Sequence, residues 1–130
     1  MDPFSFVPFM ECNHAILSMK SKADGEISIN NHKISFDNDI GYIEKDWGCS
    51  FPKSYIWCQG NDFKSSDVSF MLSIADIPFK FLHFKGIICD LIIDNSEFKF
   101  TTCNNVTLAK DNVVIFSDTS KNCGLEIVYK

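Results

Sequence analysis

Apolar and polar side chains alternate along almost the whole chain. The alternation is carried by apolar residues two positions apart: Phe4 and Phe6, Ile27 and Ile29, Ile34 and Phe36, Phe79 and Phe81, Phe98 and Phe100, and Leu125, Ile127 and Tyr129. A period of two is typical of strands with one buried face, and no segment keeps the spacing of an amphipathic helix over three turns. The pattern therefore predicts an all-β protein with about ten strands.

Short polar clusters interrupt the apolar pattern and predict the turns of an antiparallel meander. They are Asp24-Gly25, Asn30-Asn31, Asp37-Asn38-Asp39, Asp94-Asn95-Ser96, Asn104-Asn105 and Lys110-Asp111-Asn112. Glycine, asparagine and aspartate tolerate the left-handed or locally hydrogen-bonded backbone that a turn needs. Because open sheet edges invite aggregation, strands connected in this way are expected to close on themselves or to pack as two sheets.

The middle of the chain predicts the most deeply buried strands. Val68–Ile77 and Phe79–Ile93 are apolar at both odd and even positions, which indicates strands that are buried on both faces or folded across another sheet. A chain of 130 residues can build one hydrophobic core but not two, and no linker or internal repeat divides it. Residues 1–130 are therefore predicted to form a single β domain.

Charge and hydropathy exclude several classes of partner. The net charge is −5, and all twelve basic residues are lysines, whereas nucleic acid requires a clustered basic surface. The longest apolar runs fall far short of the ~20 residues that span a bilayer, and the first residues do not resemble a secretory signal. We therefore expect a cytoplasmic protein with no nucleic-acid partner and no membrane span.

The six cysteines show no C-x-x-C pair. Zinc and redox sites commonly use that spacing, and Glu11, His14, Asp46 and Cys49 show no ligand spacing either, so no metal site is predicted. In a reducing compartment the thiols are expected to stay free and buried.

The segment Gly41–Phe63 gathers acids, amides and aromatic rings. Read as a strand, Ile40–Trp47 places three side chains on one face (Tyr42, Glu44 and Asp46) and three on the other (Ile43, Lys45 and Trp47). A second strand places Tyr55, Trp57, Gln59, Asn61 and Phe63 on one face, and Ile56 and Cys58 on the other. A polar and aromatic face of this kind can line a ligand cavity. A solvent-facing stripe beside a core stripe is the alternative.

Two motifs in this part of the chain resemble the tocopherol cyclase family. One combines Glu-Lys-Asp-Trp-Gly, Phe-Pro and Trp-x-Gln-x-Asn-x-Phe, and is matched by Glu44, Lys45, Asp46, Trp47, Gly48, Phe51, Pro52, Trp57, Gln59, Asn61 and Phe63. The other is Pro-x-x-Glu-x-x-His, matched by Pro8, Glu11 and His14. Cys49 and Asp62 depart from the residues common in the family, which bears on the substrate more than on the fold.

The resemblance implies an antiparallel calycin-like or lipocalin-like β-barrel, or a strongly bent sheet, that handles isoprenoid or other long apolar molecules. Carotenoid hydratases resemble this family distantly. Members of the family carry further chain before and after the matched part, so this sequence resembles the later part of a longer protein, and its sheet is expected to be incomplete. Unpaired edge strands would then favour a homodimer.

The resemblance also implies a cofactor-independent cyclase of the isomerase type. An acid protonates a prenyl double bond, a tertiary cation forms, and a phenol oxygen closes on it. The acid must stay protonated, through burial or a neighbouring carboxylate. Asp46 is the first candidate, and Glu44 or Glu11 follows because the family tolerates an amide at the position of Asp46. His14 is the candidate acceptor of the phenolic proton.

Substrate-binding residues are expected on the same two strands. The candidates are Trp47, Tyr55, Trp57, Gln59, Asn61 and Phe63. The rings of Trp47, Tyr55 and Trp57 could face the cation. The amides of Gln59 and Asn61 could orient a hydroxyl or a water molecule. Core packing is the alternative for each ring, and is favoured for Trp47. The expected function is acid-catalysed cyclisation or hydration of a prenylated lipid, that is, of a small lipophilic molecule. A non-catalytic lipophile carrier and an inactive truncated fragment are the alternatives.

Overall fold

The computed structural model describes residues 10–61, 63–64, 67–79, 81–102, 106–108, 113–118 and 123–128. Every regular element within them is a strand: β1 (Cys12–Ile29), β2 (His32–Gly48), β3 (Tyr55–Gly60), β4 (Val68–Phe79), β5 (Leu82–Ile93), β6 (Ser96–Thr101), β7 (Val106–Leu108), β8 (Val113–Asp118) and β9 (Cys123–Val128). The predicted all-β class is confirmed. The predicted strand at Phe4 and Phe6 and the turns at Asn104-Asn105 and Lys110-Asp111-Asn112 lie outside the described residues.

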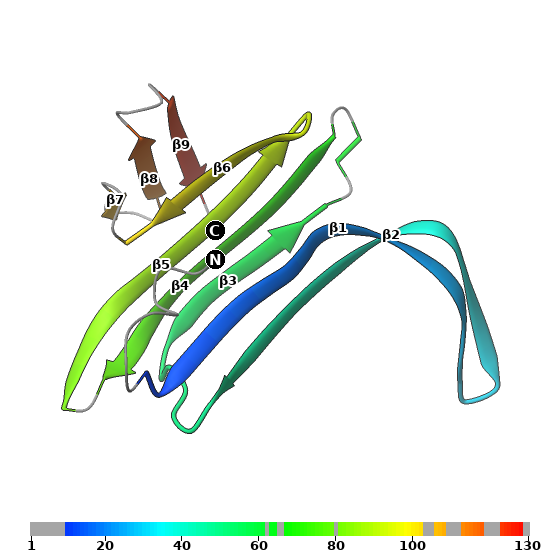
Figure 1. Cartoon of the computed structure of the whole chain (residues 1–130), viewed down its shortest axis with the longest axis horizontal. Coiled ribbons are helices and arrows are strands. Elements are labelled where there is room, and N and C mark those ends of the chain that lie inside the picture. Colours follow the sequence, from blue (N-terminus) through cyan, green and yellow to red (C-terminus); the bar gives the residue numbers. More distant parts are fainter. Residues whose placement is uncertain are drawn as a thin grey trace.

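The described strands form three antiparallel sheets and no closed barrel. β1 and β2 form a long hairpin, β3 to β6 form a four-stranded sheet in sequence order, and β7 to β9 form a three-stranded sheet. Figure 1 shows the hairpin bending sharply partway along, so that its far end extends beyond the other strands. Of the two predicted arrangements, the bent sheet therefore describes the structure.

Two predicted turns connect neighbouring strands. Asn30-Asn31 joins β1 to β2 with φ values of 49° and 66°, and Asp94-Asn95 joins β5 to β6 with 47° and 66°. A positive φ at both central residues is the type I′ geometry, whose twist matches that of the flanking strands. Asparagine and aspartate adopt this backbone at low cost, which explains why these pairs end strands.

The prediction of turns at Asp24-Gly25 and Asp37-Asn38-Asp39 is wrong, because both clusters lie inside the long strands of the hairpin. The register of β1 and β2 shifts between them. Asn38 has a φ of 58°, and its backbone N–H donates to Asp24 Oδ1 over 2.7 Å. A local irregularity of this kind is a β-bulge, which bends paired strands without ending them.

The four-stranded sheet has two different faces. One face and the three-stranded sheet enclose the hydrophobic core, whose buried residues are Leu72, Ile74, Ile87, Cys89, Phe100, Val114 and Phe116. Phe100 of β6 and Phe116 of β8 pack with ring centroids 5.3 Å apart. β4 is buried at odd and even positions alike, as is β5 around Gly86–Asp90, which confirms the predicted burial for these parts. The prediction is wrong for the start of Phe79–Ile93, because Phe81 and Leu82 are exposed at the turn between β4 and β5.

The other face of the four-stranded sheet looks toward the first half of the hairpin. Cross-strand pairing places Trp57, Ser73 and Ile88 in one row of this face. An ion pair between Lys20 of β1 and Asp67, just before β4, ties the two layers together. Ser73, Ala75 and Gly86 lie on this face beside Ile77 and Ile88, and a cavity remains between the layers.

Candidate functional site

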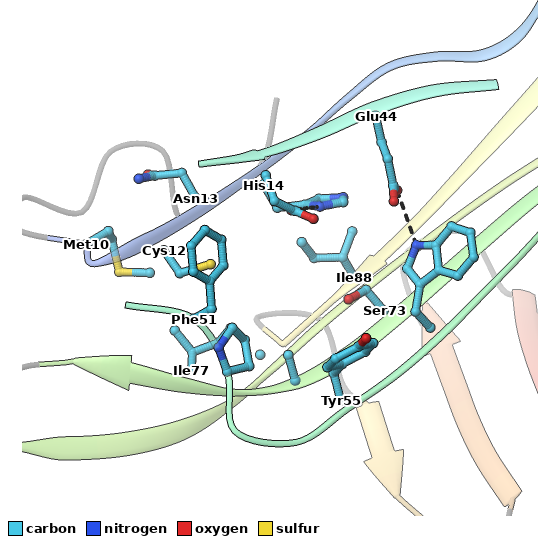
Figure 2. Close-up of a pocket in the computed structure, with 15 residues that line it drawn as sticks. Met10, Cys12, Asn13, His14, Glu44, Phe51, Tyr55, Ser73, Ile77 and Ile88 are labelled. Atoms are coloured by element: carbon cyan, nitrogen blue, oxygen red, sulfur yellow. Dashed lines mark hydrogen bonds and ion pairs between the residues drawn. The ribbon is translucent and has the colours of Figure 1, made fainter. Parts of the chain in front are cut away.

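A cavity of about 400 Å³, the first cavity, lies between the hairpin and the four-stranded sheet. Its lining residues are Met10, Cys12, Asn13, His14, Glu44, Asp46, Phe51, Pro52, Tyr55, Trp57, Ser73, Ala75, Ile77, Gly86 and Ile88. Figure 2 shows His14 and Glu44 entering from the hairpin, and Tyr55, Ser73 and Ile77 facing them from below. This volume lies within the usual range for small-molecule sites.

Small side chains on the sheet create part of this space. Ser73 and Ala75 of β4 and Gly86 of β5 stand where larger residues would fill the gap between the layers. A Cβ on Gly86 would lie only 2.8 Å from Cγ1 of Ile77, so glycine also lets that isoleucine pack closely beside it. The sequence shows these small residues, but only the strand register places them on the cavity face.

His14 and Asp46 form a pair at the hairpin wall of the first cavity. They are directly opposite each other in the β1–β2 ladder, and His14 Nδ1 lies 2.7 Å from Asp46 Oδ1. The imidazole is 14% exposed and the carboxylate 49% exposed. His14 Nε2 is buried and has no hydrogen-bond partner. The structure therefore brings together two of the four predicted catalytic residues, and leaves Nε2 of His14 without a hydrogen-bond partner.

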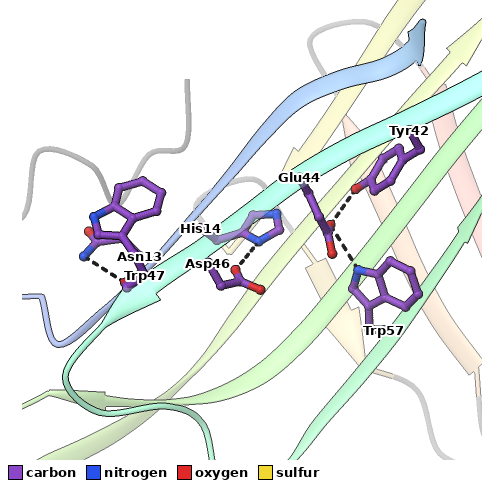
Figure 3. A network of polar contacts seen from close by, with 7 residues as sticks. All are labelled: Asn13, His14, Tyr42, Glu44, Asp46, Trp47 and Trp57. Carbon is purple, nitrogen blue, oxygen red and sulfur yellow. Dashed lines mark hydrogen bonds and ion pairs between the residues drawn. The ribbon is translucent and has the colours of Figure 1, made fainter. Parts of the chain in front are cut away.

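Glu44 is the centre of a second polar cluster on the same wall (Figure 3). Its Oε2 accepts hydrogen bonds from Tyr42 Oη over 2.6 Å and from Trp57 Nε1 over 3.2 Å. The first of these donors comes from the same strand and the second from the facing sheet. Glu44 consequently ties the indole of Trp57 to the hairpin and holds it at the edge of the cavity.

Two further groups beside the site stay protonated. Burial raises the pKa of Tyr42, and its hydrogen bond to Glu44 and the negative charges of Glu44, Asp90 and Asp46 raise it further. Burial and the charge of Asp46 likewise raise the pKa of the Cys12 thiol. Tyr42 is thus a hydrogen-bond donor, and Cys12 is a neutral wall residue rather than a nucleophile.

Trp47 and Glu11 do not line the first cavity, although both were predicted as site residues. Trp47 faces away from His14 and Glu44 (Figure 3), and Lys45 Nζ lies 4.6 Å from the centroid of its ring. The backbone carbonyl of Glu11 accepts from the amides of Cys49 and Ser50 at 2.9 and 3.2 Å, which closes the base of the hairpin. Catalysis by the Glu11 carboxylate stays a prediction.

Three other predicted binding residues, Gln59, Asn61 and Phe63, are likewise absent from the cavity lining. β3 ends at Gly60, so the predicted strand through Phe63 is wrong in its last part. The Phe63 ring folds back over Gly60, where an added Cβ would lie 3.1 Å from it. A role for these three residues in ligand binding stays a prediction. Pro8 and Asp62 lie outside the described residues.

Asp90 is a candidate that the sequence pattern did not single out. Its side chain is 6% exposed, and Oδ2 lies 3.7 Å from Lys99 Nζ. Oδ1 is buried without a hydrogen-bond partner. Burial raises the pKa of this carboxyl, an effect that the charge of Lys99 opposes. The available signal was a single acid within the apolar segment Phe79–Ile93.

Within the described part of the chain, no group of three or more histidine, cysteine or acidic residues is placed to hold a metal ion. The five described cysteines are free thiols. Cys89 is buried, but Cys49 is exposed, so the prediction of buried thiols is wrong for that residue. Cys49 follows directly after the end of β2.

The fold and the cavity define an all-β protein with acidic and aromatic groups gathered at an apolar hollow. The family model described as tocopherol cyclase-like matches residues 2–76. Because this match covers more than half of the chain, the chain belongs to the tocopherol cyclase-like family. The matched part contains the hairpin, the Phe51-Pro52 loop, β3 and most of β4.

Two plant proteins are similar to the chain. They are "Probable tocopherol cyclase, chloroplastic" from Oryza sativa subsp. japonica and "Tocopherol cyclase, chloroplastic" from Zea mays. Each is 31% identical over 68 residues, which is 52% of this chain and 14% of the relative. The chain thus matches about one seventh of the length of these relatives. No solved structure matched the chain.

None of the described residues belongs to a helix long and apolar enough to cross a membrane. Both plant relatives are described as chloroplastic. The cytoplasmic location expected from the sequence gains no support from them and stays a prediction.

Proposed function

We propose that the first cavity binds an isoprenoid or prenylated lipid and that the His14–Asp46 pair catalyses cyclisation or hydration of its double bond. The observation that carries this proposal is a hydrogen-bonded imidazole and carboxylate at a wall whose surroundings are apolar, among them Phe51, Pro52 and Ile77. Such a wall suits a prenyl chain, and the pair supplies a proton donor and acceptor. The proposal is that of an isomerase-type enzyme and requires no cofactor.

In a cyclisation, His14 both donates the proton that the alkene takes up and accepts the proton that the phenol releases. With Nδ1 held by Asp46, Nε2 is the ring nitrogen that exchanges protons. In the doubly protonated ring, Nε2–H gives its proton to the alkene, and a tertiary cation forms on the prenyl chain. The phenol oxygen bonds to that carbon, and the neutral ring takes the phenolic proton. The pair returns to its starting state, with the Asp46 carboxylate stabilising the charged ring.

Asp46 as the direct acid is the second form of this mechanism. A carboxyl that stays protonated needs a buried setting, whereas the Asp46 side chain is 49% exposed. Closure of the site around a bound lipid would supply that setting. His14→Gln separates the two forms, because it removes the ring that exchanges protons and leaves the Asp46 carboxyl in place.

We expect the aromatic rings on β3 to stabilise the cation. Tyr55 and Trp57 line the first cavity opposite the hairpin, and the Trp57 indole is fixed by its bond to Glu44. A cation over an aromatic face gains about 0.5–1 kcal/mol at an exposed site and about 2 kcal/mol when it is desolvated. Both rings are exposed in the absence of a ligand, so we expect their contribution to lie near the lower value.

The test is turnover of a prenylated hydroquinone by the purified chain. Cyclisation keeps the mass and removes one phenolic hydroxyl, so the product is separated by chromatography and confirmed by acetylation of the remaining hydroxyl. His14→Gln is expected to lower the rate about 100-fold, as is typical for loss of an acid–base group. Lys33→Gln, at the far end of the hairpin, is the control with unchanged rate.

Binding without turnover would overturn the catalytic part of the proposal and leave a lipophile carrier. Neither binding nor turnover would overturn both parts and indicate an inactive fragment. Equal rates for wild type and His14→Gln would remove the imidazole from the mechanism. The proposed homodimer through edge strands is checked separately, by sedimentation of the same preparation.

A further inference from the structure

A second cavity of about 670 Å³ lies on the same face of the four-stranded sheet, toward β6. It is bounded by β1 between His14 and Lys20, by the second half of β5, and by β6. His14 and Ile88 line both cavities, so the two hollows meet at these residues. A ligand longer than the first cavity can therefore continue into the second.

The wall of the second cavity contains a hydrogen-bond acceptor, Oδ1 of Asp90, that has no partner within the protein. The Asp90 side chain is 94% buried, given its exposed fraction of 6%, and its Oδ1 accepts no hydrogen bond. Buried polar atoms are almost always paired, since an isolated one loses its hydration without compensation. An unpaired carboxylate oxygen at a cavity wall therefore favours a ligand that brings a hydrogen-bond donor.

The neighbouring cations are already engaged. Lys99 lies 2.9 Å from Glu97 and 3.7 Å from Oδ2 of Asp90, and Lys20 is paired with Asp67. Neither lysine contacts Oδ1 of Asp90. The wall also contains apolar side chains from β1 and β5, among them Ile16, Met19 and Ile92. An uncharged hydroxyl on an apolar body suits this combination, because it satisfies the oxygen without adding a charge between two existing ion pairs.

We propose that the second cavity is a hydroxyl-binding subsite, in which Asp90 accepts a hydrogen bond from the alcohol or phenol group of an amphipathic lipid. The subsite rests on the proposed function, because it takes the polar end of the same lipid whose chain occupies the first cavity. Asp90 here is a binding residue and takes no part in proton transfer to the double bond.

The test compares two probes that differ only in the donor: farnesol and farnesyl methyl ether. Binding is followed through the fluorescence of Trp57 and Trp47, which line the first and the second cavity. Wild type is expected to bind the alcohol about tenfold more tightly than the ether, equivalent to about 1.4 kcal/mol. Asp90→Leu is expected to bind both probes equally, at the affinity of the ether. Lys33→Gln is the control that keeps the preference.

Stability of the variant separates a binding role from a structural one. Asp90→Leu removes the unpartnered Oδ1 together with Oδ2, whose partner Lys99 keeps its 2.9 Å contact with Glu97. The variant is therefore expected to melt close to wild type. If it fails to fold, Asp90→Asn serves in its place, since a neutral amide oxygen is a weaker acceptor. The preference for alcohol should then fall to about threefold, because hydrogen bonds to charged groups are roughly twice as strong as neutral ones.

Equal binding of both probes to wild type would overturn the subsite and leave the lipid cavity standing. A preference that survives in both Asp90 variants would overturn it as well, because the hydroxyl would then meet another group. If wild type binds neither probe, the proposed function fails, and the subsite fails with it.

Discussion

The hydrogen bond between Tyr42 and Glu44 is expected to be worth about 1.5 kcal/mol, and a double-mutant cycle measures it. Tyr42 Oη donates to Glu44 Oε2 over 2.6 Å, in a part-buried position at the cavity wall. Bonds to charged groups contribute about 1.5–3 kcal/mol. The lower end applies here, because the same oxygen also accepts from Trp57 and solvent reaches the cluster.

The cycle uses Tyr42→Phe, Glu44→Leu and the double variant. Each single change removes one partner, and leucine, unlike glutamine, leaves no acceptor behind. Free energies of unfolding come from urea titrations followed by tryptophan fluorescence, and their non-additivity gives the coupling. A matched control is the Lys33–Glu26 pair at the far end of the hairpin, with a similar length of 2.8 Å.

The control pair should couple by only about 0.3 kcal/mol, since exposed ion pairs contribute little. Lys33 is 69% exposed, so added salt should abolish its coupling and leave that of Tyr42 and Glu44 largely unchanged. A Tyr42–Glu44 coupling no larger than that of the control would refute the reasoning. The cavity wall would then be a loose collection of side chains and not a preorganised cluster.

Three further predictions concern stability. Burial raises the Asp90 pKa above the ordinary 3.8, so the native state keeps this proton to higher pH than the unfolded state, and wild type loses stability as pH rises from about 4. The free energy of unfolding of Asp90→Asn should therefore rise relative to that of wild type between pH 4 and 7. A difference between the two free energies that does not change with pH would contradict this. Gly48→Ala should cost about 3 kcal/mol in urea unfolding, since its Cβ would lie 2.0 Å from the Glu11 carbonyl oxygen. Phe116→Ala should cost about 3–5 kcal/mol, whereas Ile27→Ala on the exposed hairpin should cost under about 0.5 kcal/mol; equal costs in a thermal melt would place the core elsewhere.

Much of the candidate site was predicted from the alternation of side chains between the two faces of a strand. Glu44 and Asp46 were expected on one face of a strand, and Tyr55 and Trp57 on one face of the next, and all four line the first cavity. Parity is predictable because it depends only on the pleat of the backbone, which is local. The same reasoning failed beyond Gly60, where the chain leaves the strand and Phe63 turns back.

The sequence by itself determined the strand class, the two tight asparagine-rich and aspartate-containing turns, the buried middle strands and the family. Alternation and left-handed turn residues act within a few positions, so they are readable along the chain. The motif identified the strands whose side chains meet at the cavity, although it did not show which members face it.

Only the tertiary structure decided that His14 meets Asp46 across 32 positions, that β-bulges bend the hairpin, and that Asp90 is buried beside a cavity. Each depends on how distant strands pair and pack, and a register shift of one residue would turn these side chains to the opposite face. The pattern of residues therefore defines the surfaces, while long-range packing determines which of them enclose a site.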